Sequence, residues 1–163
     1  MHTKRYLILA FLLSLASVLV AETVAVGVRP VENVEFSDRL SDLVEQGAMD
    51  YLFGSGHIVF DLSVDPSNQF YSYLALDQSR RGGAAVTILM DVNFDTVAGK
   101  GVIAESIELI VLDAISEEIL HEGIVSSTVV EDYERLDAET LAERVGGIAA
   151  RDAVDSIFER RPE

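Results

Sequence analysis

The stretch AAVTILMDVNFD, residues 84–95, decides the fold of this chain. Every second residue from Val86 to Phe94 is apolar, and this period of two buries one face of a β-strand. Two further runs rich in valine and isoleucine follow at residues 102–113 and 118–130, separated by the short step 114–117. Such a step favours antiparallel pairing of the runs that it joins. Residues 84–130 are therefore predicted to form a three-stranded antiparallel meander on which the other segments pack.

A strand and a helix are predicted at the start of the chain's folded part. Residues 23–28 are rich in β-branched side chains and precede Pro30, which cannot continue the ladder of a central strand. Ser37 is placed to cap a helix that the segment Gly54-Ser55-Gly56 ends. The apolar positions of this helix recur at spacings of three and four, as one buried stripe requires. They are Leu40, Leu43, Val44, Ala48 and Leu52.

A second strand and a second helix are predicted next. Residues 57–63 alternate as a strand, and the strand-helix-strand order favours parallel pairing with the first strand. Asp65 followed by Pro66 is a helix-start signal, and Gly82-Gly83 is the matching stop. The sequence thus indicates a helix over residues 66–81, although its aromatic residues leave a strand as an alternative.

A third helix is predicted at the end of the chain. Asp137 is placed to cap it, and an apolar stripe includes Leu141, Val145 and Ile148. Gly146-Gly147 weakens this helix by about 1 kcal/mol per glycine, which close packing against the sheet would explain. The fold class is therefore α/β, a two-layer or three-layer mixed sheet in the order β-α-β-α-β-β-β-α with an antiparallel C-terminal meander.

The first residues have the layout of a secretory signal peptide. Lys4 and Arg5 precede an apolar run over residues 6–20, and small residues surround Ala21. Cleavage after Ala21 is the working prediction, with Ala16 and Ala25 as alternatives. An uncleaved membrane anchor is the rival, but it needs about 20 apolar residues. We therefore expect residues 1–21 to be a signal peptide and the product to be periplasmic or secreted, without a stable membrane span.

The length and composition of the remaining 142 residues limit the kinds of protein that they can form. They suit one domain, residues 22–163, with its own core. The chain has no cysteine, so its stability must come from packing. Its formal net charge is −16, and it becomes −18 without the two basic residues of the leader. This charge repels nucleic acid and anionic lipid, and it is typical of a soluble exported protein.

The predicted order of elements, behind a leader, resembles a small α/β envelope domain. This domain is shared by the curli-secretion lipoprotein, the penicillin-binding-protein activator lipoproteins and the N-terminal domain of TolB. The resemblance covers residues 23–158, and its most recognisable part is the hairpin at residues 109–120, a strand, an aspartate, a short turn and a strand. Ser116 stands where the family has threonine, Glu117 stands where it favours glycine, and the lipobox cysteine is absent. The resemblance implies a non-catalytic domain that binds envelope proteins.

Alternate polar residues in the third strand imitate a calcium loop. Asp91, Asn93 and Asp95 provide oxygen ligands at alternate positions, but Thr96 replaces the required glycine and Val102 replaces the bidentate glutamate. Alternate carboxylates on a strand are more often its solvated face. We expect no metal site here, and Asp61 and Asp65 receive the same interpretation.

The other candidate catalytic or binding residues also lack partners at the sequence spacing that such a site requires. His57 and His121, the only histidines beyond the leader, have no third zinc ligand near them and are expected at the partly exposed surface. Ser55 follows a helix, the reverse of a hydrolase elbow. Gly99-Lys100-Gly101 lacks the rest of a phosphate loop and is expected to be a turn. Arg80-Arg81 is expected only to favour the dipole at a helix C-terminus.

No catalytic residue, cofactor-binding residue or metal ligand is therefore assigned. The sequence favours an exported, non-enzymatic accessory domain that needs no cofactor and binds a protein partner in envelope assembly or secretion, with homo-oligomerisation open. The alternative is a periplasmic binder of a ligand or divalent metal, or an enzyme whose active site assembles from residues distant in sequence.

Overall fold

The computed structural model describes residues 21–32 and 34–158, so the predicted leader lies outside the described residues except for Ala21. The elements occur in the predicted order, with one added 3-10 turn. They are β1 (Thr23–Pro30), α2 (Ser37–Gly54), β2 (Ile58–Asp61), α3 (Tyr71–Arg81), β3 (Val86–Val97), β4 (Gly101–Asp113), β5 (Ile119–Ser126), η1 (Ser127–Val129) and α4 (Ala138–Phe158).

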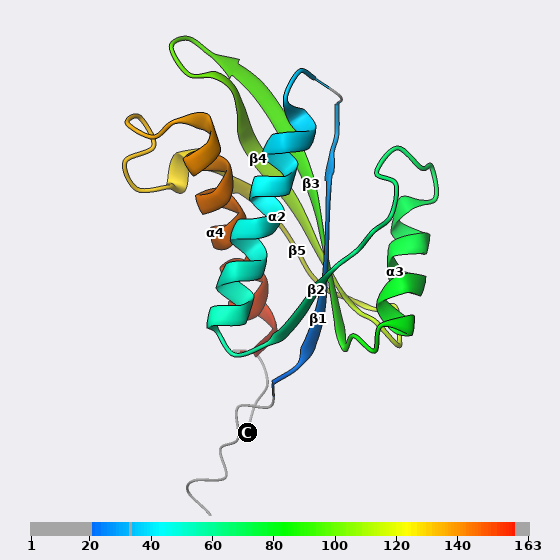
Figure 1. The fold of residues 1–163 in the computed structure, drawn as a ribbon. Coiled ribbons are helices and arrows are strands. Elements are labelled where there is room, and N and C mark those ends of the chain that lie inside the picture. The colour runs from blue at the N-terminus through cyan, green and yellow to red at the C-terminus, as the bar shows by residue number, and fades with distance from the viewer. Residues whose placement is uncertain (1–20, 33, 159–163) are drawn as a thin grey trace, which may run out of the picture.

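The strands form one mixed sheet in the order β2-β1-β3-β4-β5. Strand β1 pairs in parallel with both β2 and β3, whereas β3, β4 and β5 pair antiparallel. Helices α2 and α4 lie on one face of the sheet and α3 lies on the other (Figure 1). The predicted parallel pair, the predicted meander and the three-layer form of the α/β fold are therefore confirmed.

The main core lies between the sheet and the layer made by α2 and α4. The predicted sheet and helix residues meet in one cluster, in which Leu43, Phe94 and Ile148 are only partly buried. The buried residues of the predicted strand and helix patterns are Val86, Ile88, Met90, Val92, Leu40, Val44, Ala48, Leu52, Leu141 and Val145, and Ile107, Leu109 and Val111 of the next predicted strand join them. The faces assigned from periodicity are therefore the faces that the fold buries.

Strand β1 is longer than predicted, because it continues through Arg29 and Pro30. On one side, its pairing with β2 ends at Val26. On the other side, the N–H of Val31 donates to the carbonyl of Val92 at 3.0 Å. Successive N–H groups of a strand point to opposite sides, so the N–H that Pro30 lacks would face the side that β2 has left. The proline therefore removes no hydrogen bond between strands, and β1 can continue far enough to include Arg29 in the sheet.

Helix α3 begins five residues later than the predicted start at Pro66. The Asp65 carboxylate accepts hydrogen bonds from the N–H (2.9 Å) and hydroxyl (2.7 Å) of Ser67, and the side chain of Asn68 accepts one from the N–H of Phe70 at 2.8 Å. Such local bonds offer the backbone an alternative to the helix. Asp65 therefore organises a turn, and only residues 71–81 are helical.

Two further boundaries differ from the prediction. Helix α2 starts at Ser37, and Phe36 occupies the N-cap position with a φ of 71°, so Ser37 is the first helical residue and not the cap. The last strand ends at Ser126, where its hydroxyl accepts a hydrogen bond from the N–H of Thr128 (3.3 Å) and starts η1. By contrast, Asp137 does cap α4, since its carboxylate accepts from the N–H of Thr140 at 2.8 Å.

The glycine pair of α4 packs closely, but against α2 and not against the sheet. A Cβ atom added at Gly146 would collide with the carbonyl oxygen of Val44, and one added at Gly47 would collide with that of Glu143. The two helix backbones therefore touch where Gly47 and Gly146 cross. This contact is the physical reason for glycine within two long helices, and it corrects the predicted packing partner.

Candidate functional site

The face of the sheet opposite α2 and α4 is only partly covered. Helix α3 packs on it through Tyr71 and Ala75, which meet Ala25 and Leu89 in a small second core. Beyond α3 the parts of β3, β4 and β5 that face this side have no helix over them (Figure 1). We call this uncovered part the open face. Its residues are Asp91, Asn93, Glu108, Ile110, Glu122 and Ile124, with Arg29 of β1 at its border.

The strand register arranges these side chains in two cross-strand rows. The first row joins Arg29, Asp91, Glu108 and Ile124 across four neighbouring strands. The second row, two residues away from the first on each strand, joins Gly27, Leu89, Ile110 and Glu122. Each row therefore places one glutamate directly beside one isoleucine on β4 and β5, with the order reversed between the rows.

An ion pair bounds the open face on the side of β1. The Arg29 Nε and Nη2 atoms donate to the two carboxylate oxygens of Asp91, each at 2.6 Å. The two side chains are 31% and 23% exposed, so solvent weakens the pair only in part. The hydrogen bond that Arg29 donates to Asp91 is the main cause that raises the pKa of Arg29. Such a two-bond contact fixes both the position and the direction of the guanidinium.

Tyr71 supports this ion pair from α3. The Arg29 guanidinium lies 4.9 Å from the centre of the Tyr71 ring, a cation–π distance. The ring has room because the residue beneath it is Gly27. A Cβ atom at this position would lie 2.6 Å from the Tyr71 hydroxyl. Burial, followed by the charge of Asp91, raises the pKa of Tyr71 to about 12. The phenol therefore stays neutral and acts as a wall for the arginine.

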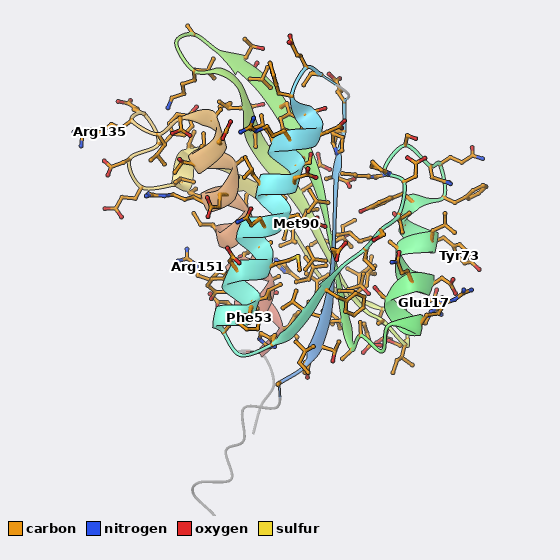
Figure 2. The ribbon with its side chains drawn as sticks, in the orientation of Figure 1. Phe53, Tyr73, Met90, Glu117, Arg135 and Arg151 are labelled. Carbon is orange, nitrogen blue, oxygen red and sulfur yellow. The ribbon has the colours of Figure 1, made fainter. Side chains whose placement is uncertain are left out.

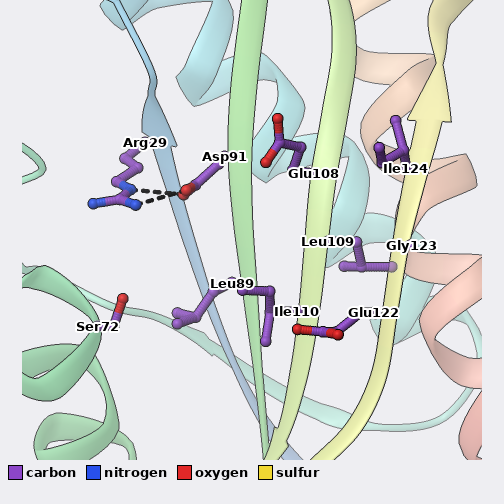
Figure 3. Close-up of a pocket in the computed structure, with 10 residues that line it drawn as sticks. All are labelled: Arg29, Ser72, Leu89, Asp91, Glu108, Leu109, Ile110, Glu122, Gly123 and Ile124. Atoms are coloured by element: carbon purple, nitrogen blue, oxygen red, sulfur yellow. Dashed lines mark hydrogen bonds and ion pairs between the residues drawn. The ribbon is translucent and has the colours of Figure 1, made fainter.

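A hollow of about 380 Å³ lies over the two rows. Figure 3 shows Arg29 and Asp91 at one side, Ile124 and Glu122 at the other, and Ser72 of α3 below the arginine. Glu108 accepts a hydrogen bond from Asn93 at 3.2 Å. Glu122 is exposed and makes no hydrogen bond or ion pair with any residue that the structure describes. The hollow is thus lined by both acidic and apolar groups.

A second hollow of about 380 Å³ adjoins the first and shares Arg29 and Asp91 with it. Its other walls come from the end of β1, the start of α2 and the loop before α3. They are Pro30, Val31, Asp38, Pro66 and Ser67. This place lies beyond the carboxyl ends of the parallel strands, where open α/β sheets commonly bind ligands.

The side chains of the calcium-like stretch have separate partners. Asp91 is held by Arg29 and Asn93 by Glu108, whereas the Asp95 carboxylate accepts from the adjacent N–H of Thr96 at 2.7 Å. In residues 21–32 and 34–158, no group of three or more His, Asp or Glu side chains is arranged to hold a metal ion. The three residues are the solvated side of β3, and two of them belong to the open face.

The two histidines lie far apart in the fold and differ in exposure. His57 precedes β2 and is buried with 8% exposure, so its predicted surface position is wrong. The carbonyl of Leu52 accepts the His57 N–H at 3.1 Å, which draws the residue under the end of α2. His121 on β5 is partly exposed, and its Nε2 atom lies 3.0 Å from the Asp152 carboxylate of α4. Neither histidine lines the open face.

The remaining sequence candidates are structural. The Ser55 hydroxyl donates to the carbonyl of Tyr51 at 2.9 Å and closes the end of α2. Lys100 sits in the predicted turn, and its Nζ atom donates to the carbonyls of Tyr133 (2.7 Å) and Leu136 (2.6 Å). These bonds tie the β3–β4 turn to the loop before α4.

The arginine pair at the end of α3 does more than the predicted interaction with the helix dipole. Arg80 forms an ion pair with Glu117 at 2.7 Å, and Arg81 forms one with Asp77 at 2.9 Å. Glu117, near the end of α3 in Figure 2, has a φ of 64°. It therefore adopts the backbone conformation for which glycine is favoured, and its side chain reaches α3.

Glu45, which lies outside the open face, has a raised pKa. Burial, together with the nearby charges of Asp61 and Asp42, raises the pKa of Glu45 to about 7. Glu45 lies on α2, away from both hollows. Its titration therefore concerns folding stability more than recognition.

Sequence reasoning identified Asp91 and Asn93 but missed Arg29, Glu108, Glu122 and Ile124 as members of one site. The available signal is a repeated Glu-x-Ile pattern, Glu108-Leu109-Ile110 in β4 and Glu122-Gly123-Ile124 in β5. In antiparallel strands with the correct register, this repeat sets each glutamate beside an isoleucine. The register itself comes from the structure.

The sequence matches no protein-family model and no curated protein. The fold, however, resembles solved structures of low sequence identity. The PelC dodecamer from Paraburkholderia phytofirmans has a TM-score of 0.54 at 12% identity, over 84% of this chain and 89% of PelC. At this identity the likeness shows a shared fold.

Two further matches have lower scores. Lipoprotein GNA1162 from Neisseria meningitidis has a TM-score of 0.46 at 12% identity, over 81% of this chain and 98% of its own. TolB from Acinetobacter baumannii has a TM-score of 0.40 at 14% identity, over 85% of this chain and 28% of TolB. Within residues 21–32 and 34–158, no helix has the length and apolar character to cross a membrane.

Proposed function

We propose that this chain is an exported, non-catalytic accessory domain of the cell envelope that binds a protein partner through its open face. The observation that carries the proposal is the unequal covering of the sheet. Two helices bury one face, whereas on the other face Ile124 is 74% exposed beside the hollow and the nearby Ile119 is 57% exposed. Apolar side chains gathered on an uncovered sheet, with polar groups around them, are typical of an interaction site.

The chemistry of the open face favours recognition over catalysis. Its arginine and one aspartate neutralise each other in a fixed contact, and its two glutamates flank isoleucines. A catalytic acid–base pair needs groups whose environments push their pKa values apart. The two acidic groups whose pKa values are raised within the described residues, Glu45 and Tyr71, do not line the hollow. The Arg29 guanidinium does line it, but its pKa is raised by the hydrogen bond to Asp91, so it stays charged.

The envelope location is supported by the leader-like N-terminus. PelC is a dodecamer, so self-association of this chain is a second possible use of an exposed sheet surface. The net charge of −16 opposes close approach of identical copies and therefore favours a different partner. A ligand or metal binder is the alternative that a binding assay with the purified chain tests.

Site-specific photocrosslinking in living cells tests the proposed surface. A photoreactive residue replacing Ile124 on the open face should give a defined protein adduct. The same residue replacing Arg144, which is exposed on α4, is the matched control and should give none. Adducts formed from position 144 and not from position 124 would place the partner on the helical layer and refute the proposed surface.

Export is tested separately by the mass of the protein recovered from cell fractions. The proposal requires an extracytoplasmic product that begins near Glu22. A full-length product that starts at Met1 and stays in the cytoplasm would contradict it.

A further inference from the structure

Given the proposed function, on which this step rests, we infer that the open face binds an extended, basic segment of the partner. This segment carries lysine or arginine at alternate positions. Three features indicate a basic partner segment: the two cross-strand rows, the charge balance of the face and the length of basic side chains.

The rows provide two matching subsites. In the first row Glu108 lies opposite Ile124, and in the second row Ile110 lies opposite Glu122. Side chains directly opposite on antiparallel strands have Cβ atoms about 5 Å apart. Each subsite therefore offers an apolar surface and a carboxylate within reach of a single long side chain.

The charge of the face is negative once its internal ion pair is counted. Arg29 makes a two-bond contact with Asp91, so these two charges satisfy each other. Glu108 receives only one neutral hydrogen bond, from Asn93, and Glu122 receives none from the described residues. Two carboxylates thus remain available to an incoming cation, on a chain whose formal net charge is −16.

Lysine and arginine fit these subsites better than other side chains. Their aliphatic stems can cover an isoleucine while the charged end stays near the glutamate. A wholly apolar segment would bury two carboxylates without partners, which is strongly unfavourable. An acidic segment would be repelled.

The spacing indicates an extended segment. The two rows are two residues apart along β4 and along β5, which is about 7 Å. Alternate side chains of an extended peptide have the same spacing of about 7 Å on one side. A peptide that runs along the strands over the hollow can therefore place one basic residue in each subsite, with Ser72 of α3 as a side wall.

The test uses a fluorescent synthetic peptide, Thr-Lys-Val-Lys-Val-Lys-Thr, titrated into the purified full chain. Binding should be saturable and weaken as salt is added. The double variant Glu108→Gln and Glu122→Gln should weaken binding at least tenfold. The variant Ile124→Ser should weaken it several-fold, because the stem of the basic side chain loses its contact.

Matched controls separate a defined site from general attraction to an acidic protein. Glu35→Gln with Glu134→Gln removes the same number of charges from exposed positions away from the face and should change the affinity less than twofold. A peptide in which glutamate replaces each lysine should not bind. Equal weakening by the control variant, or no effect of Ile124→Ser, would overturn the inference. Retained thermal melting shows that each variant is folded.

Failure of this inference differs from failure of the proposed function. If crosslinking places a partner at position 124 but the basic peptide does not bind, the docking surface stands and the basic partner chemistry is wrong. If the peptide binds at the two glutamates but no crosslink forms at position 124 in cells, the peptide site exists and the proposed function fails.

Discussion

The two faces of the strands β3, β4 and β5 differ in composition, although successive residues of the same strands supply them in turn. On the side of α2 and α4, β4 presents Ile107, Leu109 and Val111, all of them buried. On the opposite side it presents Glu108 and Ile110 to the hollow. Folding therefore depends mainly on the face that α2 and α4 cover. The residues of the open face are less constrained by packing and can be used for recognition. Substitutions on the two faces should separate stability from binding.

The layers that cover the two faces differ in the same way. Helices α2 and α4 touch backbone to backbone at Gly47 and Gly146 and bury the larger core. Helix α3 rests on the sheet through a smaller cluster around Tyr71, and its Tyr73 points outward to solvent (Figure 2). The first layer is thus the one whose disturbance should unfold the chain.

The largest expected effect is in the main core. Leu141→Ala should lower the free energy of unfolding by about 2–5 kcal/mol, because it leaves a cavity between α4 and the sheet. Phe94→Ala should cost less, since Phe94 is only partly buried. Chemical denaturation measures both. Unchanged stability in the two variants would mean that the faces are wrongly assigned.

The helix crossing should respond to a single methyl group. Gly146→Ala places a Cβ atom against the carbonyl of Val44 and should cost about 1–3 kcal/mol despite the better helix propensity of alanine. Gly54→Ala is the matched control, because a Cβ there has no atom within 4 Å. If both variants melt at the wild-type temperature, the close crossing is not present in solution.

The ion pair at the border of the open face should contribute less than the core. Asp91→Asn leaves the half-buried Arg29 guanidinium without its carboxylate and should cost about 1–3 kcal/mol. Asp95→Asn on the same strand, where the side chain is exposed, should change stability by less than about 0.5 kcal/mol. Equal losses in urea denaturation for the two variants would argue against a special role of Asp91.

The pH dependence of stability should reflect Glu45. Its pKa is raised to about 7 in the folded chain from an ordinary value of 4.5, so the folded state holds a proton that the unfolded state has lost between these values. Stability should therefore fall as the pH rises from about 4.5 to about 7, by about 1 kcal/mol after allowance for solvent screening. Glu45→Gln should flatten this part of the melting profile. A slope that persists in the variant would assign the titration to another group.

The smallest effect is expected on the open face. Ile124→Thr should change the free energy of unfolding by less than about 0.5 kcal/mol, because the side chain is already exposed to water. Val125→Thr, the next residue and on the buried face, should cost about 1–3 kcal/mol by burying a hydroxyl. Similar losses at the two positions would remove the distinction between the faces.

The sequence could predict the covered face because burial leaves a periodic trace. Val86, Ile88 and Val92 recur at every second position, and nothing but a buried strand face accounts for that pattern. The order of the elements follows from such patterns and from their glycine and proline boundaries. The close contact of Gly146 was assigned to the wrong neighbour, since a small residue signals a near approach but not the element that approaches.

The open face could not be assembled from the sequence for a different reason. Its members come from strands up to about a hundred residues apart, and each of them looks ordinary alone. Arg29 entered the site only because β1 continues to Pro30, and Glu108 meets Ile124 only because of the register of β4 and β5. Binding properties of this kind arise from the pairing of strands, which composition and periodicity do not specify.

The contact between Arg80 and Glu117 has a mechanical consequence. It links the end of α3 to the turn that joins β4 and β5, at 2.7 Å. Helix α3, which forms one wall of the hollow, is thereby held in place relative to β5, which forms the opposite wall. This brace adds to the small core on which α3 packs. A braced cleft loses little internal freedom when a ligand enters, so less of the contact energy is consumed by ordering the receptor. Glycine at position 117 would relieve the backbone and remove this brace.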